Sequence, residues 1–410
     1  MARRIRVALY SHDAMGIGHL RRNLLVAGTL STACAQRGDE LAVLLLVGAR
    51  EATLFELPPG ADCLALPAIS KTPEGVYRPR SLGIELRDLV SLRSSTIEAA
   101  LRAFAPDVLV VDKIPRGVAN ELDASLKMLA GQTRCVLGMR DILDEPEIIQ
   151  REWAANRNQQ AIREWYNSVW VYGCRHVFDV AAEYRLDPDV AAKLSYTGYL
   201  NRVGSNTQDA EIRLPEGKLI LCMVGGGQDG AELAQAFAEA CLPEGCIGLI
   251  VTGPFMPTEA RRKVNELAQR SAGRIRAVDF VAQPEALLRR AEKVVAMAGY
   301  NTICEILSHR KPALIAPRIA PRLEQWIRAR RLAEMGLIDT LGPEKPSAKA
   351  ISAWLASDRQ PNNSAYERID LGALKRLPDL FDELIGPQRA PELSFLIGGS
   401  LPGKVSHVAG

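Results

Sequence analysis

One stretch of the sequence places polar side chains where a phosphate-containing ligand could bind. Asn301 and Thr302 follow Gly299 at the turn between an apolar strand, 294–298, and a helix, and Glu305 lies one turn further on. In α/β sheets the N-termini of such helices present free N–H groups and a partial positive charge, which suit a diphosphate. Thr302 and Glu305 are also spaced as a capping box, in which the glutamate only bonds the helix N-terminus. The spacing alone leaves both interpretations open.

Two glycine-rich turns follow apolar strands and are further candidates for ligand binding. The first turn, 16–19, lacks the third glycine of the dinucleotide fingerprint, because Arg21 occupies its position. The second turn, 225–230, satisfies the spacing, yet the next strand ends at Thr252 without an acidic residue for a ribose. We therefore expect neither NAD nor FAD, and the second turn suits the diphosphate of another nucleotide. Asp229 in this turn would repel a diphosphate unless its carboxylate points outward.

His19 directly follows Gly18 and is the candidate general base. A neutral imidazole near pH 7 accepts the proton of an attacking hydroxyl group, and such a transfer supplies roughly 10² to 10⁴ in rate. A histidine beside a glycine turn can equally be a structural hydrogen-bond donor.

Two strands of the N-terminal half end in charged residues. Asp112 and Arg116 follow one strand, and Arg140 and Asp141 follow another. Because strand ends of this kind line a cleft, these residues are candidates for contact with an acceptor substrate. Alternatively, they pair with one another at the rim of the cleft.

Alternating strands and helices must position these residues. Apolar strand patterns alternate with helical patterns, which argues for an α/β architecture with doubly wound parallel sheets. A polar stretch at 196–217, broken by glycine and proline, predicts a linker between an N-terminal domain, 1–195, and a C-terminal domain, 218–385. The helical pattern before Leu384 is expected to cross back to the first domain. Glycine and proline dominate 386–410, which predicts a poorly ordered tail.

The composition limits the class of protein. The chain has 410 residues, enough for two domains with their own cores, and its net charge of +3 is too small to argue for nucleic-acid binding. Eight cysteines are scattered without C-x-x-C pairs, so we expect neither disulfides nor zinc ligands. No apolar run approaches the roughly 18 to 20 residues of a membrane span, and the basic start leads into a strand pattern. We expect a cytoplasmic protein.

Residues 75–101 mix arginines, at Arg78, Arg80, Arg87 and Arg93, with apolar side chains. Such a mixture could dock at an anionic bilayer or at a lipid-phosphate acceptor, which would place the protein peripherally at the inner face of a membrane. More often, such a mixture is an ordinary loop and a core-facing helix with solvated charges.

Three segments resemble the C-terminal domain of glycosyltransferase family 28, the MurG-like GT-B glycosyltransferases: AGYNTICEIL at 298–307, the strand KPALIAP, and a helix opening with Glu324 and Gln325. The Gly-x-Gly-His turn resembles the family's N-terminal loop. The resemblance implies two Rossmann-like domains that face each other across a cleft. Ala298 replaces the first glycine of the family pattern, and Glu324 and Asp229 depart from the donor pattern of MurG. The chain is therefore expected to be a distant relative and not MurG itself.

The resemblance implies roles on both sides of the cleft. In the family, the glutamate that matches Glu305 grips both ribose hydroxyls of UDP, and the threonine that matches Thr302 contacts the phosphates. The histidine that matches His19 faces the donor, and the backbone at the positions of Phe280 and Val281 pairs with uracil. The implied donor-binding residues are Gly225, Gly226, Gly227, Phe280, Val281, Ala298, Gly299, Asn301, Thr302, Glu305, Glu324 and Gln325. Candidates on the acceptor side are Gly16, Gly18, Arg21, Asp112, Arg116, Arg140 and Asp141.

These observations predict an inverting, metal-independent glycosyltransferase. It would move a sugar from a UDP-sugar, with UDP-GlcNAc as one option, to a hydroxyl of a cell-envelope, polysaccharide or secondary-metabolite acceptor. The nucleotide sugar is a co-substrate; no cofactor or metal is expected, because backbone dipoles would stabilise the leaving diphosphate. The D-x-D pattern at 187–189 is attributed to a helix start. A non-hydrolysing UDP-sugar epimerase and a catalytically silent GT-B protein that binds a glycan or a partner are the alternatives.

Overall fold

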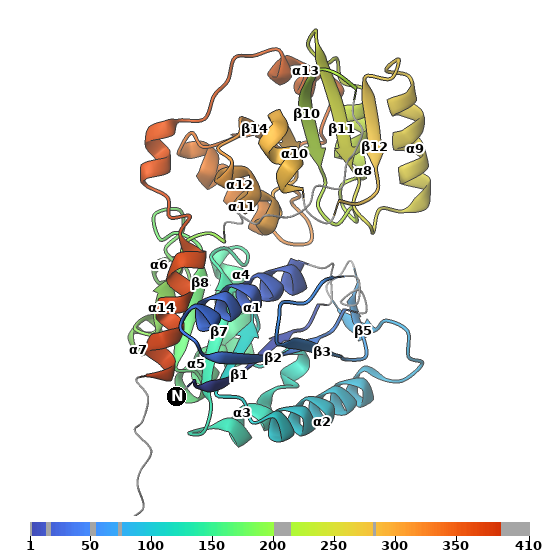
Figure 1. Ribbon diagram of the computed structural model, residues 1–410. Helices are drawn as coiled ribbons and strands as arrows, with labels where there is room; N and C mark the ends of the chain where they lie inside the picture. Colours follow the sequence, from blue (N-terminus) through green and yellow to red (C-terminus); the bar gives the residue numbers. More distant parts are fainter. Residues whose placement is uncertain are drawn as a thin grey trace, which may run out of the picture.

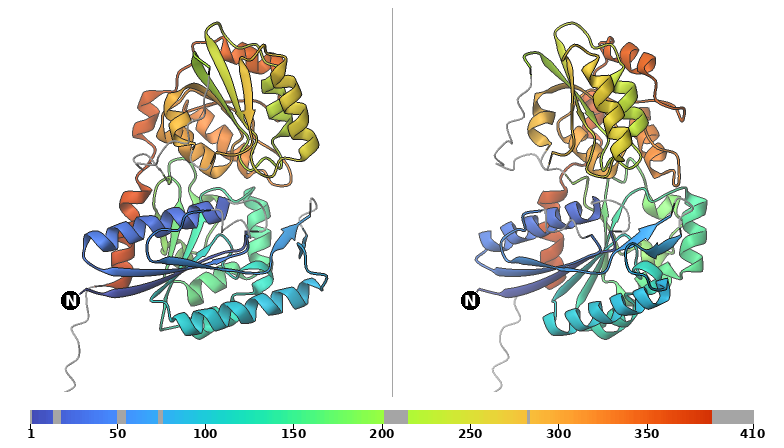
Figure 2. Two further views of the ribbon diagram at one scale, coloured as in Figure 1. Left: turned by 45° about the vertical axis from the view of Figure 1, so that its right-hand side comes forward. Right: turned by 90° about the vertical axis from the view of Figure 1, so that its right-hand side faces the viewer.

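The described part of the chain forms two α/β bodies, one above the other in Figure 1 and distinct in both side views of Figure 2. The computed structural model describes residues 2–13, 18–49, 55–72, 76–200, 215–281 and 284–386. Within these residues, the first body contains a seven-stranded sheet and the second a six-stranded sheet, and the strand pairs in both sheets are parallel. The α/β class with doubly wound parallel sheets is thus confirmed.

The first sheet has the strand order β3-β2-β1-β6-β7-β8-β9. Its strands are β1 (Arg4–Ser11), β2 (Glu40–Val47), β3 (Ala61–Ala65), β6 (Val108–Asp112), β7 (Arg134–Arg140), β8 (Ser168–Tyr172) and β9 (Leu194–Tyr196). A separate antiparallel pair is formed by β4 (Ile69–Lys71) and β5 (Tyr77–Pro79). The helices of this body are α1 (Gly18–Gln36), α2 (Leu86–Phe104), η2 (Val118–Asn120), α3 (Asp123–Leu129), α4 (Pro146–Ala155), α5 (Asn158–Trp165), α6 (Val180–Glu183) and α7 (Pro188–Ala191).

The second sheet has the strand order β12-β11-β10-β13-β14-β15. Its strands are β10 (Lys218–Met223), β11 (Cys246–Val251), β12 (Ile275–Val278), β13 (Ala291–Ala296), β14 (Ala313–Ile315) and β15 (Asp339–Thr340). The helices after β10 are α8 (Ala231–Ala238), α9 (Thr258–Gln269), α10 (Glu285–Arg290), α11 (Tyr300–Ser308), α12 (Glu324–Glu334), α13 (Ala348–Leu355), η3 (Asn363–Glu367) and α14 (Ala373–Ile385).

The last helix, α14, belongs by sequence to the second half but packs on α1 of the first body, as Figure 1 shows in red. Arg37, directly after α1, and Asp382 of α14 form an ion pair with an N–O distance of 2.5 Å. The carbonyl of Asp370, just before α14, accepts a hydrogen bond from the backbone N–H of Tyr199. The C-terminal part of the chain therefore ties the two bodies together.

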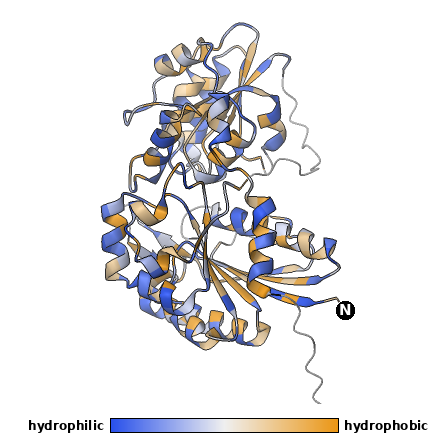
Figure 3. Ribbon diagram, turned by 90° about the vertical axis from the view of Figure 1, so that its left-hand side faces the viewer, coloured by the Kyte–Doolittle hydropathy of each residue, from blue (hydrophilic) through white to orange (hydrophobic). Residues whose placement is uncertain are grey.

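The central strands are continuous apolar runs because both faces of each sheet are covered by helices. Every residue of β6 and of β11 is buried. Figure 3 shows the strands of the first sheet mainly in the hydrophobic colour, whereas the surrounding helices alternate between polar and apolar residues. The candidate site lies at the carboxyl ends of these buried strands.

The segment expected to contact a membrane is only partly exposed. Arg93 in α2 is fully buried, and its guanidinium donates two hydrogen bonds, of 2.6 and 2.9 Å, to the carboxylate of Glu121. Arg93 therefore cannot contact a bilayer, which corrects its assignment to a basic surface. Val76, Leu82 and Ile84 nearby are exposed. Among the described residues, no helix combines the length and the apolar character needed to cross a membrane.

Candidate active site between the two bodies

The strand order of each sheet reverses at one point, and ligands of such sheets bind at the carboxyl ends of the strands there. In the first sheet the reversal lies between β1 and β6, and in the second it lies between β10 and β13. The helices that follow β1 and β13 meet across the gap, because Nδ2 of Asn301 in α11 donates a hydrogen bond to the carbonyl of Gly18 in α1 at 3.2 Å. The two reversal points therefore face each other.

A pocket at this junction brings together most of the residues predicted from the sequence. The first body lines it with Gly18, His19, Arg21 and Arg140, and the second with Gly225, Gly226, Gly227, Phe280, Val281, Gly299, Asn301, Thr302, Glu305 and Gln325. Gly16 lies outside the described residues. Five further predicted residues lie behind this lining or away from it: Asp112, Arg116, Asp141, Ala298 and Glu324.

The start of α11 does not contain the capping box that the spacing allowed. The helix begins at Tyr300 after Gly299, so Thr302 lies inside the first turn and does not cap it. The carboxylate of Glu305 accepts a hydrogen bond from Nη2 of Arg21 at 3.0 Å instead of one from its own helix start. Glu305 therefore faces the cleft and the other body, and the capping interpretation is wrong.

The turns after β10 and β11 each require a glycine. Gly227 has φ of 92°, and a Cβ atom there would lie 2.3 Å from the carbonyl oxygen of Thr252. Gly253 has φ of 80°, and its Cβ atom would lie 2.4 Å from the carbonyl oxygen of Gly225. The turns after β10 and β11 thus pack backbone against backbone, and the first of them keeps its shape at the pocket edge.

Arg318, which follows β14, lies beside Asp229, the residue expected to repel a diphosphate, and partly neutralises its charge. Its Nε lies 3.5 Å from a carboxylate oxygen of Asp229, and its Nη2 donates a hydrogen bond of 2.7 Å to Glu324. Burial raises the pKa of Glu324 but Arg318 and other cations outweigh it, so the net shift is downward and the carboxylate stays ionised. Sequence reasoning gave Arg318 no role, although its place at a strand end was a signal.

Glu324 and Gln325 begin α12, but only one of them lines the pocket. The side-chain oxygen of Gln325 accepts a hydrogen bond of 3.3 Å from the backbone N–H of Arg318, and Gln325 lines the pocket. Glu324 is buried behind it and is bonded to Arg318. Only Gln325 is therefore placed to meet a ligand directly.

His19 forms a buried network with Asp112 and Arg22 at the carboxyl ends of β1 and β6. Nδ1 of His19 lies 2.5 Å from one carboxylate oxygen of Asp112, and Nη2 of Arg22 donates to both oxygens of that carboxylate at 2.6 Å. A carboxylate 2.5 Å from Nδ1 favours the tautomer with the proton on Nδ1, which then donates to Asp112, although Nη2 of Arg22 also lies 2.8 Å from Nδ1. The lone pair of Nε2 is then left available to a ligand.

The surroundings keep His19 neutral. The pKa of His19 is lowered to about 4, mainly by burial and also by Arg22 and Lys113, while Asp112 acts in the opposite direction. The ring of His12, also buried, lies 4.8 Å from that of His19 between centroids, and burial lowers its pKa as well. Near neutral pH, His19 is therefore able to accept a proton.

Asp112 is thus a partner of His19 and not a free contact for an acceptor, which corrects the sequence-based assignment. Arg22 was missed, although its position one helical turn after His19 places both on one face of α1. Its side chain is buried, with its guanidinium carbon 5.7 Å from the centre of the Tyr300 ring. This network therefore extends from the first body to α11 of the second.

Two other acceptor candidates have structural partners. Arg116 forms an ion pair with Asp123 and donates a hydrogen bond to the carbonyl of Asn156, away from the pocket. Asp141 is fully buried and accepts hydrogen bonds from the hydroxyl of Tyr199, at 2.6 Å, and from the backbone N–H of Ile142. The strand-end charges therefore do not pair with one another, and among them only Arg140 lines the cleft.

Ala298 lies behind the pocket, where the two bodies are joined by a buried arginine. Arg328 in α12 donates hydrogen bonds to the carbonyl of Ala298 at 3.1 Å and to the carbonyl of Ile142, in the first body, at 3.3 Å. Its side chain is fully buried. A small residue at position 298 therefore lets this bridge approach the backbone.

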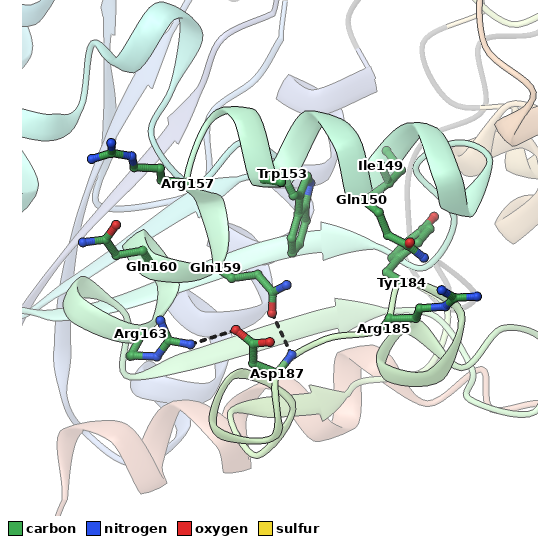
Figure 4. Close-up of a pocket in the computed structure, with 11 residues that line it drawn as sticks. Ile149, Gln150, Trp153, Arg157, Gln159, Gln160, Arg163, Tyr184, Arg185 and Asp187 are labelled. Carbon is green, nitrogen blue, oxygen red and sulfur yellow. Dashed lines mark hydrogen bonds and ion pairs between the residues drawn. The ribbon is translucent and has the colours of Figure 1, made fainter.

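Asp187, the first acid of the D-x-D pattern, lines a different pocket of the first body, drawn in Figure 4. Arg163 pairs with Asp187, at 2.9 Å, and with Asp189, and Gln159 accepts a hydrogen bond from the backbone N–H of Asp187. Trp153 of α4 lines the same pocket. These carboxylates are thus used in ion pairs at the start of α7. In the part of the chain that the structure describes, no group of three or more His, Cys, Asp or Glu residues is arranged to hold a metal ion.

Comparison with known proteins gives similarity in structure alone. No protein-family model and no curated protein sequence matches this chain. The structure of LpCGTa in complex with UDP is similar with a TM-score of 0.61 at 14% identity, covering 94% of this chain and 100% of that one. A Listeria monocytogenes protein described as a UDP-N-acetylglucosamine 2-epimerase gives 0.60 at 15% identity, covering 93% and 96%.

MurG from Acinetobacter baumannii is also similar, with a TM-score of 0.56 at 14% identity, covering 92% of this chain and 99% of that one. At sequence identities this low, the structural similarity establishes a common fold and not a common activity. The predicted relationship to MurG-like proteins is therefore confirmed at the level of the fold. The chain has the two-domain GT-B fold.

Proposed function

We propose that this protein is an inverting glycosyltransferase that moves a sugar from a UDP-sugar to an acceptor hydroxyl group. One observation carries the proposal: His19, with Nε2 available, and the carboxylate of Glu305 line one pocket from opposite bodies. A base on one side and a nucleotide-binding helix start on the other are what a transfer between two bound substrates needs.

The donor is proposed to bind against the second body. Glu305 would accept hydrogen bonds from the two ribose hydroxyls, and Thr302 with the N–H groups at the start of α11 would bind the diphosphate. The turn at 225–227 lines the same pocket and adds further backbone N–H groups. LpCGTa, which has a similar fold, was determined in complex with UDP, and this supports UDP as the nucleotide.

Transfer would proceed as a single in-line displacement. The acceptor oxygen attacks the anomeric carbon while its proton passes to Nε2 of His19, and the bond from that carbon to the diphosphate oxygen breaks as UDP leaves. Asp112 would keep the proton on Nδ1 and stabilise the imidazolium that forms. The backbone N–H groups at the start of α11 would stabilise the charge on the departing diphosphate, so no metal is required.

The acceptor is proposed to be a hydroxyl-bearing molecule of the cell envelope, a polysaccharide or a secondary metabolite, with peripheral membrane contact through the exposed part of 76–92. Leu82 and Ile84 are exposed there, and the side chain of Arg87 is 93% exposed. Weaker binding of Leu82→Ser and Arg87→Gln to anionic liposomes would support this contact. Binding as strong as that of the wild type, with Arg102→Gln as the control, would contradict it.

One alternative has an observation in its favour, since a protein described as a UDP-N-acetylglucosamine 2-epimerase has a similar structure. An epimerase would convert UDP-GlcNAc without an acceptor. Incubating the protein with UDP-GlcNAc alone and recording proton NMR spectra separates the two activities. An epimerase changes the configuration of the sugar without an acceptor, whereas a transferase without an acceptor leaves it unchanged.

Calorimetric titration with UDP, GDP, dTDP and NAD, in EDTA, tests the donor site. We expect selective binding of UDP that is lost in Glu305→Ala and kept in Glu292→Ala, a change of an exposed glutamate in β13. Binding of none of these nucleotides would refute the donor site and favour a catalytically silent binding protein.

A further inference from the structure

Three basic side chains lie near one another on the first body's side of the cleft without a carboxylate partner. Lys71 ends β4, Lys113 directly follows β6, and Arg140 ends β7. Lys113 interacts electrostatically with both of the others. Across the ranges that the structure describes, none of the three side chains forms an ion pair, and the buried Nε of Arg140 has no hydrogen-bond partner. We call these three residues the cationic cluster.

The other cations around the cluster are neutralised. Each has a carboxylate within ion-pair distance, in the pairs Arg22–Asp112 at 2.6 Å, Arg322–Glu152 at 2.7 Å and Arg318–Glu324 at 2.7 Å. Glu324 is an acid whose charge acts on Lys113, and it already bonds Arg318. Among the described residues, the three cations of the cluster have no carboxylate within ion-pair distance, although Asp144, Glu152 and Glu324 act electrostatically on Lys71.

This arrangement is unfavourable for the protein alone. The pKa of Lys113 is lowered to about 7, mainly by burial and also by Arg140 and Arg322. Burial likewise lowers the pKa of Arg140 to about 10 and shifts the pKa of Lys71 downward. Positive charges held together in a partly buried site favour the binding of a negative group, because such a group offsets their mutual repulsion.

The cluster is separate from the groups expected to bind the donor diphosphate. Those groups, the start of α11 and the turn at 225–227, belong to the second body, whereas the cluster belongs to strand ends of the first. Arg140 lines the cleft together with His19, while Lys71 and Lys113 lie outside the lining of that pocket. An anion on the cluster would thus belong to the ligand that approaches from the first body.

We propose that the cationic cluster binds an oxyanion group, a phosphate or a carboxylate, of the acceptor substrate. The inference rests on the proposed function, in which the acceptor lies on the first body beside His19. The bound oxyanion would accept hydrogen bonds from Nζ of Lys113 and from the unpartnered Nε of Arg140. It would hold the acceptor so that a hydroxyl of the same molecule reaches the base.

Thermal unfolding in inorganic phosphate or acetate, at constant ionic strength and with saturating UDP, tests the cluster. UDP occupies the donor site, so that an anion cannot stabilise the protein there. We expect phosphate to raise the midpoint of the wild type in a concentration-dependent way, and Lys113→Met and Arg140→Met to lose at least half of this shift. Lys127→Met, which removes an exposed lysine from α3, is the matched control and should keep the shift.

The comparison of anions identifies the group, since a shift with phosphate alone indicates a phosphoryl acceptor and a shift with acetate as well indicates that carboxylates also bind. Without any anion, Lys113→Met should unfold at the same or a higher temperature than the wild type, because it removes an unbalanced charge. A wild type that phosphate does not stabilise, or variants that keep its full shift, would overturn the proposal. Failure of UDP to bind would refute the donor site. The same anion titrations without UDP would then still test whether the cationic cluster binds an anion.

Discussion

The carboxylate of Glu305 in the second body accepts a hydrogen bond of 3.0 Å from Nη2 of Arg21 in the first, across the mouth of the pocket. Both side chains are mostly buried, with 17% of Arg21 and 11% of Glu305 exposed. The same carboxylate is proposed to accept hydrogen bonds from the ribose of the donor. Binding of a donor would therefore compete with a contact that joins the two bodies.

This competition predicts opposite effects of two substitutions on the affinity for UDP. Glu305→Gln removes charge-assisted hydrogen bonds worth about 1.5–3 kcal/mol, so UDP should bind roughly 10- to 150-fold more weakly. Arg21→Gln frees the carboxylate from a pair worth up to about 1 kcal/mol, so UDP should bind up to about fivefold more tightly. Calorimetry on both variants and on the double variant measures the coupling. Tighter binding that persists in the double variant would show that Arg21 acts through another group.

The glycine turn after β10 gives a prediction with an internal control. Gly227→Ala would place a Cβ atom 2.3 Å from the carbonyl oxygen of Thr252, so the turn must move and UDP affinity should fall about tenfold or more. At Gly225, which also has a positive φ, a Cβ atom would meet no atom within 4 Å. Gly225→Ala should therefore lower stability by about 1–2 kcal/mol but keep UDP affinity within about threefold. Equal affinities of the two variants would argue against a diphosphate at this turn.

Removal of divalent metal ions should leave the transfer rate unchanged. The proposed stabilisation of the leaving diphosphate comes from backbone N–H groups at the start of α11, which do the work that a metal does in other transferases. The measurement is the initial rate of UDP release, with each candidate acceptor, before and after dialysis against EDTA. A rate that falls with EDTA and returns with Mg²⁺ or Mn²⁺ would contradict this account of the leaving group.

The sequence predicted the parallel sheets and the residues that line the pocket from the second body, because both depend on local patterns. Continuous apolar runs predict buried strands, and the turns at 225–230 and 299–302 follow such runs directly. The short strands β9 and β15 were missed, since they are too short to show a period.

The partners of the charged side chains could not be predicted in this way. Glu305 and Arg21 are 284 residues apart, and Asp112 and His19 are 93 residues apart, so no spacing rule relates them. The T-x-x-E spacing allowed Glu305 to accept a hydrogen bond from the start of its own helix. In the fold, its carboxylate instead accepts one from Arg21 of the other body. Many residues that line the pocket were therefore predictable, but the pairing of their charged side chains required the fold.

The buried pair of Arg93 and Glu121 predicts a large loss of stability. Arg93→Met would leave the fully buried carboxylate of Glu121 without its two hydrogen bonds from the guanidinium, and removal of one partner of such a pair costs about 3–5 kcal/mol. Arg102→Met, in the same helix, breaks an exposed pair with Glu98 worth about 0.3–0.5 kcal/mol and is the control. Urea unfolding measures both free energies. Similar values for the two variants would show that Glu121 finds another partner or a proton at little cost.

The environment of His19 predicts an unusual dependence of the rate on pH. A general base must be unprotonated, so activity is lost as the pH falls through its pKa, which burial lowers to about 4 from an ordinary value near 6.5. We expect kcat, with both substrates saturating, to stay constant from pH 8 down to about 5.5 and to fall only below that. His19→Ala should lower kcat by roughly 10² to 10⁴ while UDP affinity is kept.

Arg22 and Asp112 allow the origin of this behaviour to be tested. Arg22 lowers the pKa of His19, so Arg22→Met should raise it and move the acidic limb of the profile toward pH 6.5. Asp112→Asn should lower kcat about 10²-fold or more, because Arg22 would bond the amide oxygen and the amide NH2 group would then donate to Nδ1 of His19, which moves the free lone pair away from Nε2. Asp123→Asn, which changes a carboxylate paired with Arg116 outside the pocket, should leave both the profile and the rate unchanged. An acidic limb near pH 6.5 in the wild type, unmoved by Arg22→Met, would assign the base to a residue other than His19.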